Sequence, residues 1–386
     1  MFSEEMPTYT KPTESRIEFI RNLLKDNKLK GMIELDIWDT DSAVSVRLDK
    51  KFMDIKALLN SMNVKLKYFK SDTYGHTFKA ISTNKQTILT VLIRPFPKDD
   101  YGPINSLSRP ENAELRMLKL LSNFVIRGYT PHIILPINTF DTSITHFTTV
   151  PKHIIDLADE KNALYKTFIE RYNDGELEDV VSVLISEWCN GGDLLDYIRK
   201  NYATMTLKTW TVIIFQILFT LTIIHNKYPA FRHNNLKANN IWVQLSNIEK
   251  KNKYRYDIEN YKFLIPNINL QIRLAEFDFA CIDGVIENNK VNAEWTKKIN
   301  ITKKENKYYD MHYFFNTLTS KIFFPQFYEG GAPAEIVDFV HRIIPTEYRI
   351  NSENVNKRGR ILVDVEYTTP YKVIMEDPLF DKYRFN

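Results

Sequence analysis

The chain has 386 residues, of which 44% are hydrophobic and 26% are charged, and its net charge at pH 7 is +4. The length suits one bilobal unit or about two domains with a sizeable core, and the composition excludes a disordered or membranous chain. The small net charge gives no argument for nucleic acid or an anionic membrane as a partner.

The first predicted elements lie in residues 1–65, a charged stretch that we interpret as an N-terminal extension. The segments 14–27 and 50–62 are typical of helices, and we expect a short strand between them. The acidic, polar start of the chain does not have the pattern of a signal peptide. We find no candidate chemistry in this extension.

From residue 66 the pattern changes to short β-like runs. The helix expected among them, 110–125, begins with a proline, which is favoured at a first helical position, and carries apolar residues at helical spacing. A polar insertion at about 141–178 is also expected to be helical. The predicted strands are 65–71, 75–82, 87–96, 131–140 and 179–188.

The rest of the chain is mainly helical in pattern, with an exception at 241–282. The most apolar run, 210–225, predicts a buried helix; it is shorter than a membrane span and contains polar residues, so we expect no span. Strands, one helix, more strands and then helices predict an α+β fold with a small β-rich lobe at 66–186 and a larger α-helical lobe at 187–386.

The chain has two cysteines, Cys189 and Cys281. They provide neither a disulfide framework nor a metal-ligand cluster, so we expect an intracellular, reducing compartment.

The segment 231–243, "FRHNNLKANNIWV", holds the first chemical pattern. Protein kinases have a catalytic loop H-R-D-L-x-x-x-N, whose Asp accepts the proton of the substrate hydroxyl and whose Asn holds a magnesium ion. His233, Leu236 and Asn240 keep the spacing of that loop, but its Asp position holds Asn235.

Four further segments resemble the protein kinase family and follow in the order expected of it. They are 184–201 (the hinge and the first helix of the large lobe), 274–284 (the D-F-G region), 306–318 (the buried central helix) and 368–380 (the end of the last helix). The resemblance runs from about residue 66 to the C-terminus and implies a bilobal protein-kinase-like fold. Fold alone does not establish function, so each chemical position needs its own test.

Within that family the sequence is most similar to the serine/threonine kinases of large cytoplasmic DNA viruses, including the poxvirus kinase packaged in virions. A long insertion, 244–273, separates the catalytic loop from the D-F-G region, no A-P-E motif follows, and the central helix comes early. This resemblance implies a location in the host cytoplasm or the virion.

The resemblance implies ATP and Mg²⁺ as ligands, bound weakly or not at all, and it implies which residues would contact the nucleoside. Backbone groups of Glu187 and Cys189 would contact the adenine, Asp193 would lie near the ribose, and Ser186 would be a small gatekeeper.

Other matched positions concern the metal and the phosphates. Asp278 and Asn240 would bind Mg²⁺, for which oxygen-bearing side chains are suited, although a lone Asp or Asn in a loop is usually a turn residue. Lys237 could reach the γ-phosphate, and Ala280 replaces the D-F-G glycine. Asp310 would brace the backbone of the catalytic loop.

The base position departs from the family. An amide can orient a hydroxyl but cannot accept its proton at neutral pH, so Asn235 would lose general-base assistance of about 10²–10⁴-fold. Phosphoryl transfer depends mostly on positioning and charge neutralisation, which leaves room for residual activity. Asn234 stands where Arg is usual, which removes the docking partner of a phosphorylated activation loop.

The phosphate loop departs from the family pattern as well. The glycine pattern of kinases falls on Lys70, Asp72 and Gly75, so a single glycine remains. The charge of Asp72 would oppose phosphate binding. The alternative is an ordinary β-turn between two strands.

The anchoring lysine is also replaced. Counting from Gly75 puts Leu92 at its position, whereas matching "VLIR" to V-A-I-K puts Arg94 there, and the two share a strand face. Arg94 could reach Glu114 or Glu111, but its planar fork is not equivalent to an ammonium at a phosphate. The alternative is a structural ion pair.

Trp242 replaces the leucine that usually packs under the adenine. An indole there could stack on the base or fill its pocket, and a buried core tryptophan is the alternative.

Three functions are compatible with these residues. The first is a pseudokinase that acts by binding or scaffolding proteins, because the changes fall on positions that serve one reaction. The second is an active serine/threonine protein kinase in which Arg94, Lys237 and Asn235 have altered roles. The third is a small-molecule phosphotransferase with the related H-x-D-x-x-x-x-N outline. We also consider that residues 1–65 mediate assembly.

Overall fold

The computed structural model describes residues 14–36, 46–98, 100–152, 154–247 and 253–385. The chain forms two compact units. The sheet unit consists of Ser15–Asn123 and Ile134–Trp188. The helical unit contains Phe124–Ile133 and Cys189–Asn386. Strands early in the chain and helices later confirm the predicted α+β fold.

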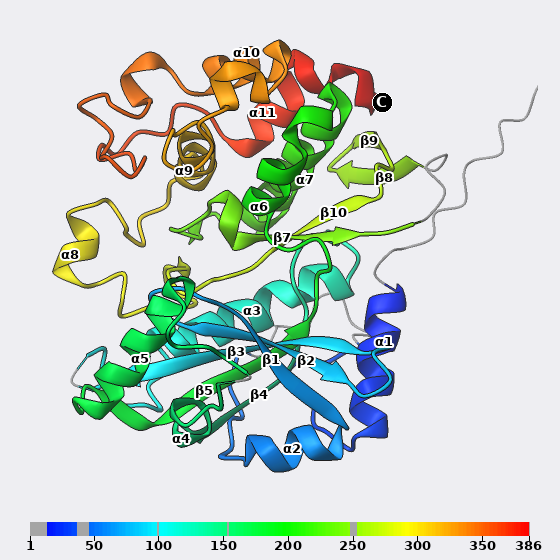
Figure 1. The fold of residues 1–386 in the computed structure, drawn as a ribbon. Coiled ribbons are helices and arrows are strands. Elements are labelled where there is room, and N and C mark those ends of the chain that lie inside the picture. The colour runs from blue at the N-terminus through cyan, green and yellow to red at the C-terminus, as the bar shows by residue number, and fades with distance from the viewer. Residues whose placement is uncertain (1–13, 37–45, 99, 153, 248–252, 386) are drawn as a thin grey trace, which may run out of the picture. The chain divides into compact units, whose positions relative to one another are not determined.

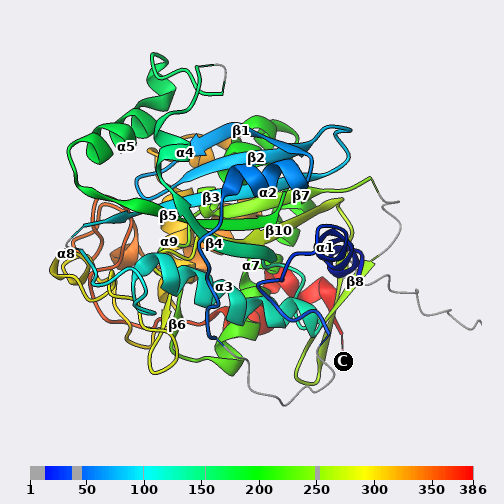
Figure 2. The same cartoon turned by 90° about the horizontal axis from the view of Figure 1, so that it is seen from below.

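The sheet unit is built on five antiparallel strands in the order β1-β2-β3-β5-β4, and Figure 2 shows them following one another in this order. The central strand β3 is buried on both faces over most of its length, as its run of Ile, Leu and Val requires. The strands are β1 Val64–Ser71, β2 His76–Ser82, β3 Ile88–Pro97, β4 Pro136–Ser143 and β5 Leu177–Glu187. The helices are α1 Glu14–Asp26, α2 Ile55–Ser61, α3 Pro110–Ile126, α4 Thr145–Thr148 and α5 Ala163–Asn173.

The described part of the N-terminal extension, from residue 15 onward, is integrated into the sheet unit. The side chain of Lys50 is 9% exposed, and its Nζ lies 2.6 Å from Asp141 Oδ1 of β4 and 2.9 Å from Asn112 Oδ1 of α3. The backbone N–H of Met32 donates to Ile137 O of β4. Both predicted helices of the extension are present as α1 and α2. The predicted strand between them is absent from residues 27–36 and 46–54, and 37–45 lie outside the described residues.

The helical unit has α7, Leu207–Lys227, at its centre, in contact with α10, α11 and β10 (Figure 1). The predicted buried helix is therefore confirmed, but our expectation that it is shorter than a membrane span is wrong. With 21 residues, α7 is the one helix among the described residues that is long and apolar enough to cross a bilayer. Since 78% of its most apolar stretch is buried inside the protein, it resembles the core helix of a globular unit. The other helices are α6 Leu194–Asn201, α8 Glu294–Lys297, α9 Tyr309–Leu318, α10 Ala334–Ile343 and α11 Pro370–Glu376.

The segment 241–282, which we expected to depart from the mainly helical pattern of this unit, forms strands. Two of them, β7 and β10, pair with each other, while β8 and β9 form a hairpin that β12 extends. The insertion predicted at 244–273 is thus mainly this hairpin. The strands of the unit are β6 Phe231–Arg232, β7 Ile241–Leu245, β8 Lys253–Ile258, β9 Tyr261–Pro266, β10 Leu270–Leu274, β11 Cys281–Ile282 and β12 Arg384–Phe385.

Candidate kinase-like site

The catalytic-loop segment of the helical unit is fixed by a buried carboxylate. Asp310, in the first turn of α9, accepts hydrogen bonds from the backbone N–H groups of His233 (2.7 Å) and Asn234 (2.8 Å). Burial raises the pKa of Asp310, while His233, Arg232 and these two hydrogen bonds oppose the shift. The predicted brace is confirmed. Asn234 has φ +59°, a left-handed conformation that Asn tolerates better than most residues.

Asn235, at the base position, is held by an arginine that lies far away in the sequence. Arg360 Nη2 donates to Asn235 Oδ1 at 3.1 Å. Arg360 Nη1 donates to Asn234 O and to Tyr309 Oη, and the guanidinium carbon lies 4.0 Å from the centre of the Tyr313 ring. Arg360 is itself buried, so the side chain of Asn235 is fixed from the interior of the unit.

The segment that follows the D-F-G region is docked against the catalytic loop by the amide of Asn234 and the guanidinium of Arg232. Asn234 Nδ2 donates to Phe279 O (3.2 Å) and Thr302 O (3.1 Å). Arg232 donates to Thr302 Oγ1 (2.7 Å) and Asn300 O (2.9 Å). Asn234 therefore does more than replace the arginine that would bind a phosphorylated activation loop. Its amide joins the catalytic loop to the D-F-G region and to the segment that follows it.

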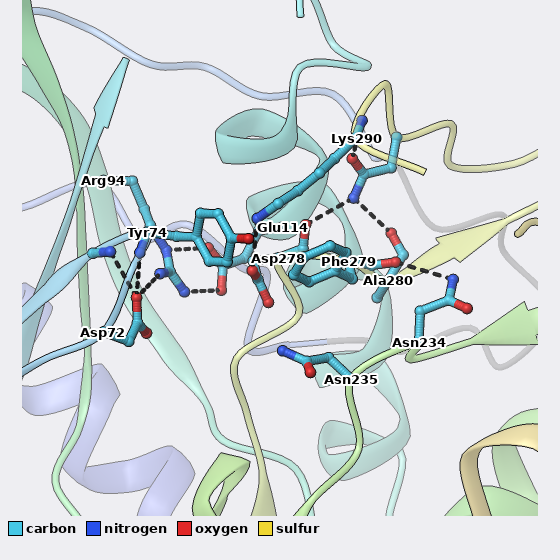
Figure 3. A network of polar contacts seen from close by, with 12 residues as sticks. Asp72, Tyr74, Arg94, Glu114, Asn234, Asn235, Asp278, Phe279, Ala280 and Lys290 are labelled. Carbon is cyan, nitrogen blue, oxygen red and sulfur yellow. Dashed lines mark hydrogen bonds and ion pairs between the residues drawn. The ribbon is translucent and has the colours of Figure 1, made fainter. Parts of the chain in front are cut away.

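Asp278 forms a buried ion pair with Lys290 (Figure 3). The lysine Nζ lies 2.9 Å from Asp278 Oδ2 and 3.9 Å from the centre of the Phe279 ring, and the two charged side chains are 3% (Lys290) and 8% (Asp278) exposed. The carboxylate that the family would offer to a metal thus already has a cation. Such pairing is what a buried carboxylate requires.

Lys290 is positioned by the same short segment. Asn288 Nδ2 donates to Asp278 O and Ala280 O, each at 3.1 Å, and Asn288 Oδ1 accepts from the backbone N–H of Lys290 at 3.1 Å. Thr296 Oγ1 donates to Lys290 O at 3.0 Å. These contacts fix the backbone on both sides of the lysine.

Of the two residues predicted to bind Mg²⁺, Asp278 does not fit a divalent cation as it is arranged, because its Oδ2 is paired with an ammonium group. Asn240 donates through its Nδ2 to Asn235 O at 2.8 Å, a bond that orients the amide without using its oxygen. No group of three or more His, Cys, Asp or Glu suited to a metal occurs within the described residues.

The helical unit also contains four other residues that were predicted to contact the nucleotide, and the contacts described for them lie within this unit. Asp193 caps α6, because its Oδ1 accepts from the backbone N–H of Asp196 at 2.9 Å. Trp242 is a buried residue of β7, and Cys189 is buried as well. Lys237 is half-buried, and its carbonyl accepts from the backbone N–H of Asn240 at 2.9 Å. Contact of these residues with a nucleotide stays a prediction.

In the sheet unit, Arg94 is paired with Glu114 (Figure 3). Arg94 Nε and Nη2 donate to the two carboxylate oxygens of Glu114 at 2.8 and 3.0 Å, and both side chains are buried. Glu111, the other acid considered from the sequence, instead binds Arg109. Leu92 is buried on the same strand without a charge. Arg94 therefore makes the contact with α3 that the anchoring cation of the family would make.

The predicted phosphate loop is a tight turn closed by its own aspartate. Asp72 Oδ1 accepts from the backbone N–H groups of Tyr74 (2.6 Å) and Gly75 (2.8 Å), an arrangement typical of Asp at turns, and it also lies 3.4 Å from Arg94 Nη1. A Cβ on Gly75 would lie 2.6 Å from Arg94 Nη1, so the glycine makes room for this arginine. Lys70 is half-buried at the end of β1. These contacts favour the turn over a phosphate loop.

Glu187, the last residue of β5, has its backbone groups engaged within the sheet unit. Its N–H donates to Leu135 O at 3.1 Å, and its carbonyl accepts from Thr90 Oγ1 at 2.9 Å. Its carboxylate binds Arg16 of α1, with Arg16 Nε 2.9 Å from Oε2. Ser186 precedes it as a buried, small residue.

Sequence reasoning missed the cations that complete these arrangements. Lys290 lies in a polar stretch without a motif, and Arg360 and Arg16 act on residues more than 100 positions away. No local pattern marks such residues, because their partners are defined by the fold.

No protein-family model matches the chain. The chain is 62% identical over 380 residues to an Acanthamoeba polyphaga mimivirus protein described as a "putative serine/threonine-protein kinase", and the alignment covers 97% of this chain and 81% of the relative. A second mimivirus protein with the same description is 32% identical over 80 residues, 20% of each chain. An uncharacterized protein of the same virus is 24% identical over 323 residues, which cover 78% of this chain and 36% of that protein.

The first relative is aligned over most of both chains, and the order of the kinase-like segments agrees with the fold. The chain therefore belongs to the serine/threonine-protein-kinase family found in giant DNA viruses.

Proposed function

We propose that this protein is a viral member of the kinase family with weak or no phosphotransfer, acting by binding other proteins. The observation that carries the proposal is Asn235. Its amide cannot accept a proton at neutral pH, and its oxygen already accepts a hydrogen bond from Arg360. The group at the base position therefore serves the packing of the helical unit.

Contacts at the predicted nucleotide positions support weak nucleotide affinity. The carbonyl and N–H of Glu187 already have partners in the sheet unit, and a ligand would have to compete with or share them. The Asp72 carboxylate occupies the turn where the family places a phosphate loop, and like charges there oppose a triphosphate.

An active kinase with a non-standard site is the second candidate, and one observation favours it. The pair of Arg94 and Glu114 retains a cation on β3 joined to α3, in a buried two-point geometry. Because phosphoryl transfer depends on positioning and charge, an intact scaffold could retain slow turnover.

Thermal unfolding in the presence of ATP tests the binding half of this proposal. A ligand that binds the folded state raises the apparent stability by mass action. We expect little or no shift of the midpoint at millimolar ATP, with or without Mg²⁺. A shift of several degrees at micromolar ATP would contradict weak affinity.

The variant Asn235→Asp tests the catalytic half. We expect its phosphotransfer rate with Mg²⁺ or Mn²⁺ to exceed that of the native chain by less than tenfold, because the other changed positions remain. A gain of 100-fold or more would mean that the site is otherwise competent, and the proposal would then be wrong. Asp196→Asn, a half-exposed change on α6, serves as the matched control.

A further inference from the structure

We propose that Lys290 supplies the positive charge at Asp278 in place of a divalent cation, so that this position excludes Mg²⁺ and Mn²⁺. The inference rests on the proposed function only in taking Asp278 as the family's metal position.

The pair of Lys290 and Asp278 is close and buried. A separation of 2.9 Å between Nζ and Oδ2 is a charge-assisted hydrogen bond, and both side chains are more than nine-tenths buried. A divalent ion bound to the same carboxylate would lie within a few ångströms of an ammonium group, where low dielectric makes like-charge repulsion strong. The lysine and a metal therefore cannot both occupy this carboxylate.

Lys290 is held in place through both its backbone and its ammonium group. Asn288 and Thr296 hold its backbone on both sides, through hydrogen bonds at 3.0–3.1 Å. The ammonium group lies 3.9 Å from the centre of the Phe279 ring, whose face attracts a cation. Phe279 in turn belongs to a buried apolar cluster with Cys281, Val291 and Ile301.

Besides Asp278, the sequence predicted one further metal ligand, Asn240, whose Nδ2 donates to Asn235 O and whose Oδ1 is the one atom it could offer to a metal. Within the described residues no cluster of three acidic, histidine or cysteine side chains is available as an alternative site. One carboxylate that is already neutralised is a poor site for a hard cation, which requires several oxygen ligands.

Electron paramagnetic resonance of Mn²⁺ tests the inference directly, since free and protein-bound Mn²⁺ give different spectra. The full chain is titrated with Mn²⁺ alone, without nucleotide. We expect no stoichiometric binding by the native protein at submillimolar Mn²⁺. The variant Lys290→Met, which is close in length and uncharged, should bind Mn²⁺ at least tenfold more tightly than the native chain, and Lys290→Met/Asp278→Asn should lose that gain.

Lys303→Met is the matched control, because Lys303 lies in the same region but is exposed and pairs with Asp283 and Glu287. It should leave Mn²⁺ binding unchanged. The inference is overturned if the native chain binds one Mn²⁺ that Asp278→Asn abolishes, or if folded Lys290→Met binds no better than the native chain. Should Lys290→Met fail to fold, the comparison of the native chain with Asp278→Asn still decides.

The test is independent of catalysis. Phosphotransfer without Mn²⁺ binding would contradict the proposed function and leave this inference standing. Mn²⁺ binding at Asp278 without phosphotransfer would overturn this inference and leave the proposed function standing.

Discussion

Two buried ion pairs, one in each unit, depart from the kinase pattern in opposite ways. In the sheet unit the residue has changed and the contact remains, since Arg94 stands at the lysine position and still binds Glu114. In the helical unit the residue remains and the partner differs, since Asp278 is present but binds Lys290. The identity of a matched residue therefore does not establish its role; the partner must be known as well.

The first pair gives the largest expected effect on stability. Glu114→Ala leaves Arg94 buried with its main partner removed, and breaking a buried pair costs about 3–5 kcal/mol. We expect the free energy of unfolding, measured by denaturant titration, to fall by an amount in this range. Arg94→Met/Glu114→Leu, which removes both charges, should recover most of the loss.

Glu176→Ala is the control for this pair, because Glu176 and its partner Arg171 are both exposed. Exposed pairs contribute about 0–1 kcal/mol. If Glu114→Ala were no more destabilising than Glu176→Ala, the pair of Arg94 and Glu114 would not be the structural anchor of the sheet unit.

The brace of the catalytic loop gives the next effect. Asp310→Asn provides one acceptor oxygen where two backbone N–H groups now donate to a carboxylate, and hydrogen bonds to a charged group contribute about 1.5–3 kcal/mol. We expect a loss of stability of that size and faster amide hydrogen exchange at His233 and Asn234. Asp364→Asn, at an exposed pair with Lys304, should change neither quantity. Unchanged exchange in Asp310→Asn would contradict the brace.

Buried histidines in both units should make the protein less stable in acid. Burial lowers the pKa of His76 in the sheet unit, and of His225 in the helical unit, from 6.5 to about 3. Below pH 6.5 these histidines are therefore protonated in the unfolded chain but remain neutral in the folded chain. The free energy of unfolding consequently falls as the pH drops toward 3. Between pH 6.5 and 5 each histidine should cost about 2 kcal/mol.

The measurement is the free energy of unfolding at pH 6.5 and pH 5 for the native chain and for His76→Asn. The variant should lose less stability between the two values than the native chain does. Equal losses would mean that His76 does not remain neutral in the folded sheet unit.

The smallest effect concerns the N-terminal segment. Arg16→Ala removes the partly buried contact with Glu187, and the carboxylate keeps the Leu135 N–H as a donor. We expect a loss of about 1–2 kcal/mol. Limited proteolysis should cut α1 sooner in this variant than in Lys25→Ala, an exposed change on the same helix. Equal rates would show that this contact does not hold α1 on the sheet unit.

The sequence predicted those parts of the molecule that depend on local pattern. Alternating and apolar runs predicted the five strands of the sheet, and a first-position proline placed the start of α3 correctly. The resemblance to the kinase family predicted that Asp310 would brace the loop, and it does.

What the sequence could not predict depends on partners distant along the chain. From spacing alone, either Glu111 or Glu114 could pair with Arg94. In the structure Arg94 pairs with Glu114, while Glu111 pairs with Arg109. Lys290 and Arg360 carry no motif, and only the folded chain brings them to Asp278 and Asn235. A charged residue in a loop is recognised as part of a site only when its partner is known.

The central claim is that this kinase fold no longer transfers phosphate efficiently. The most direct measurement is phosphotransfer from ATP by the purified full chain, with Mg²⁺ or Mn²⁺ and a general protein substrate, compared with Asp278→Ala. Our account predicts that the native chain is no faster than Asp278→Ala. Robust turnover by the native chain that disappears in Asp278→Ala would contradict it.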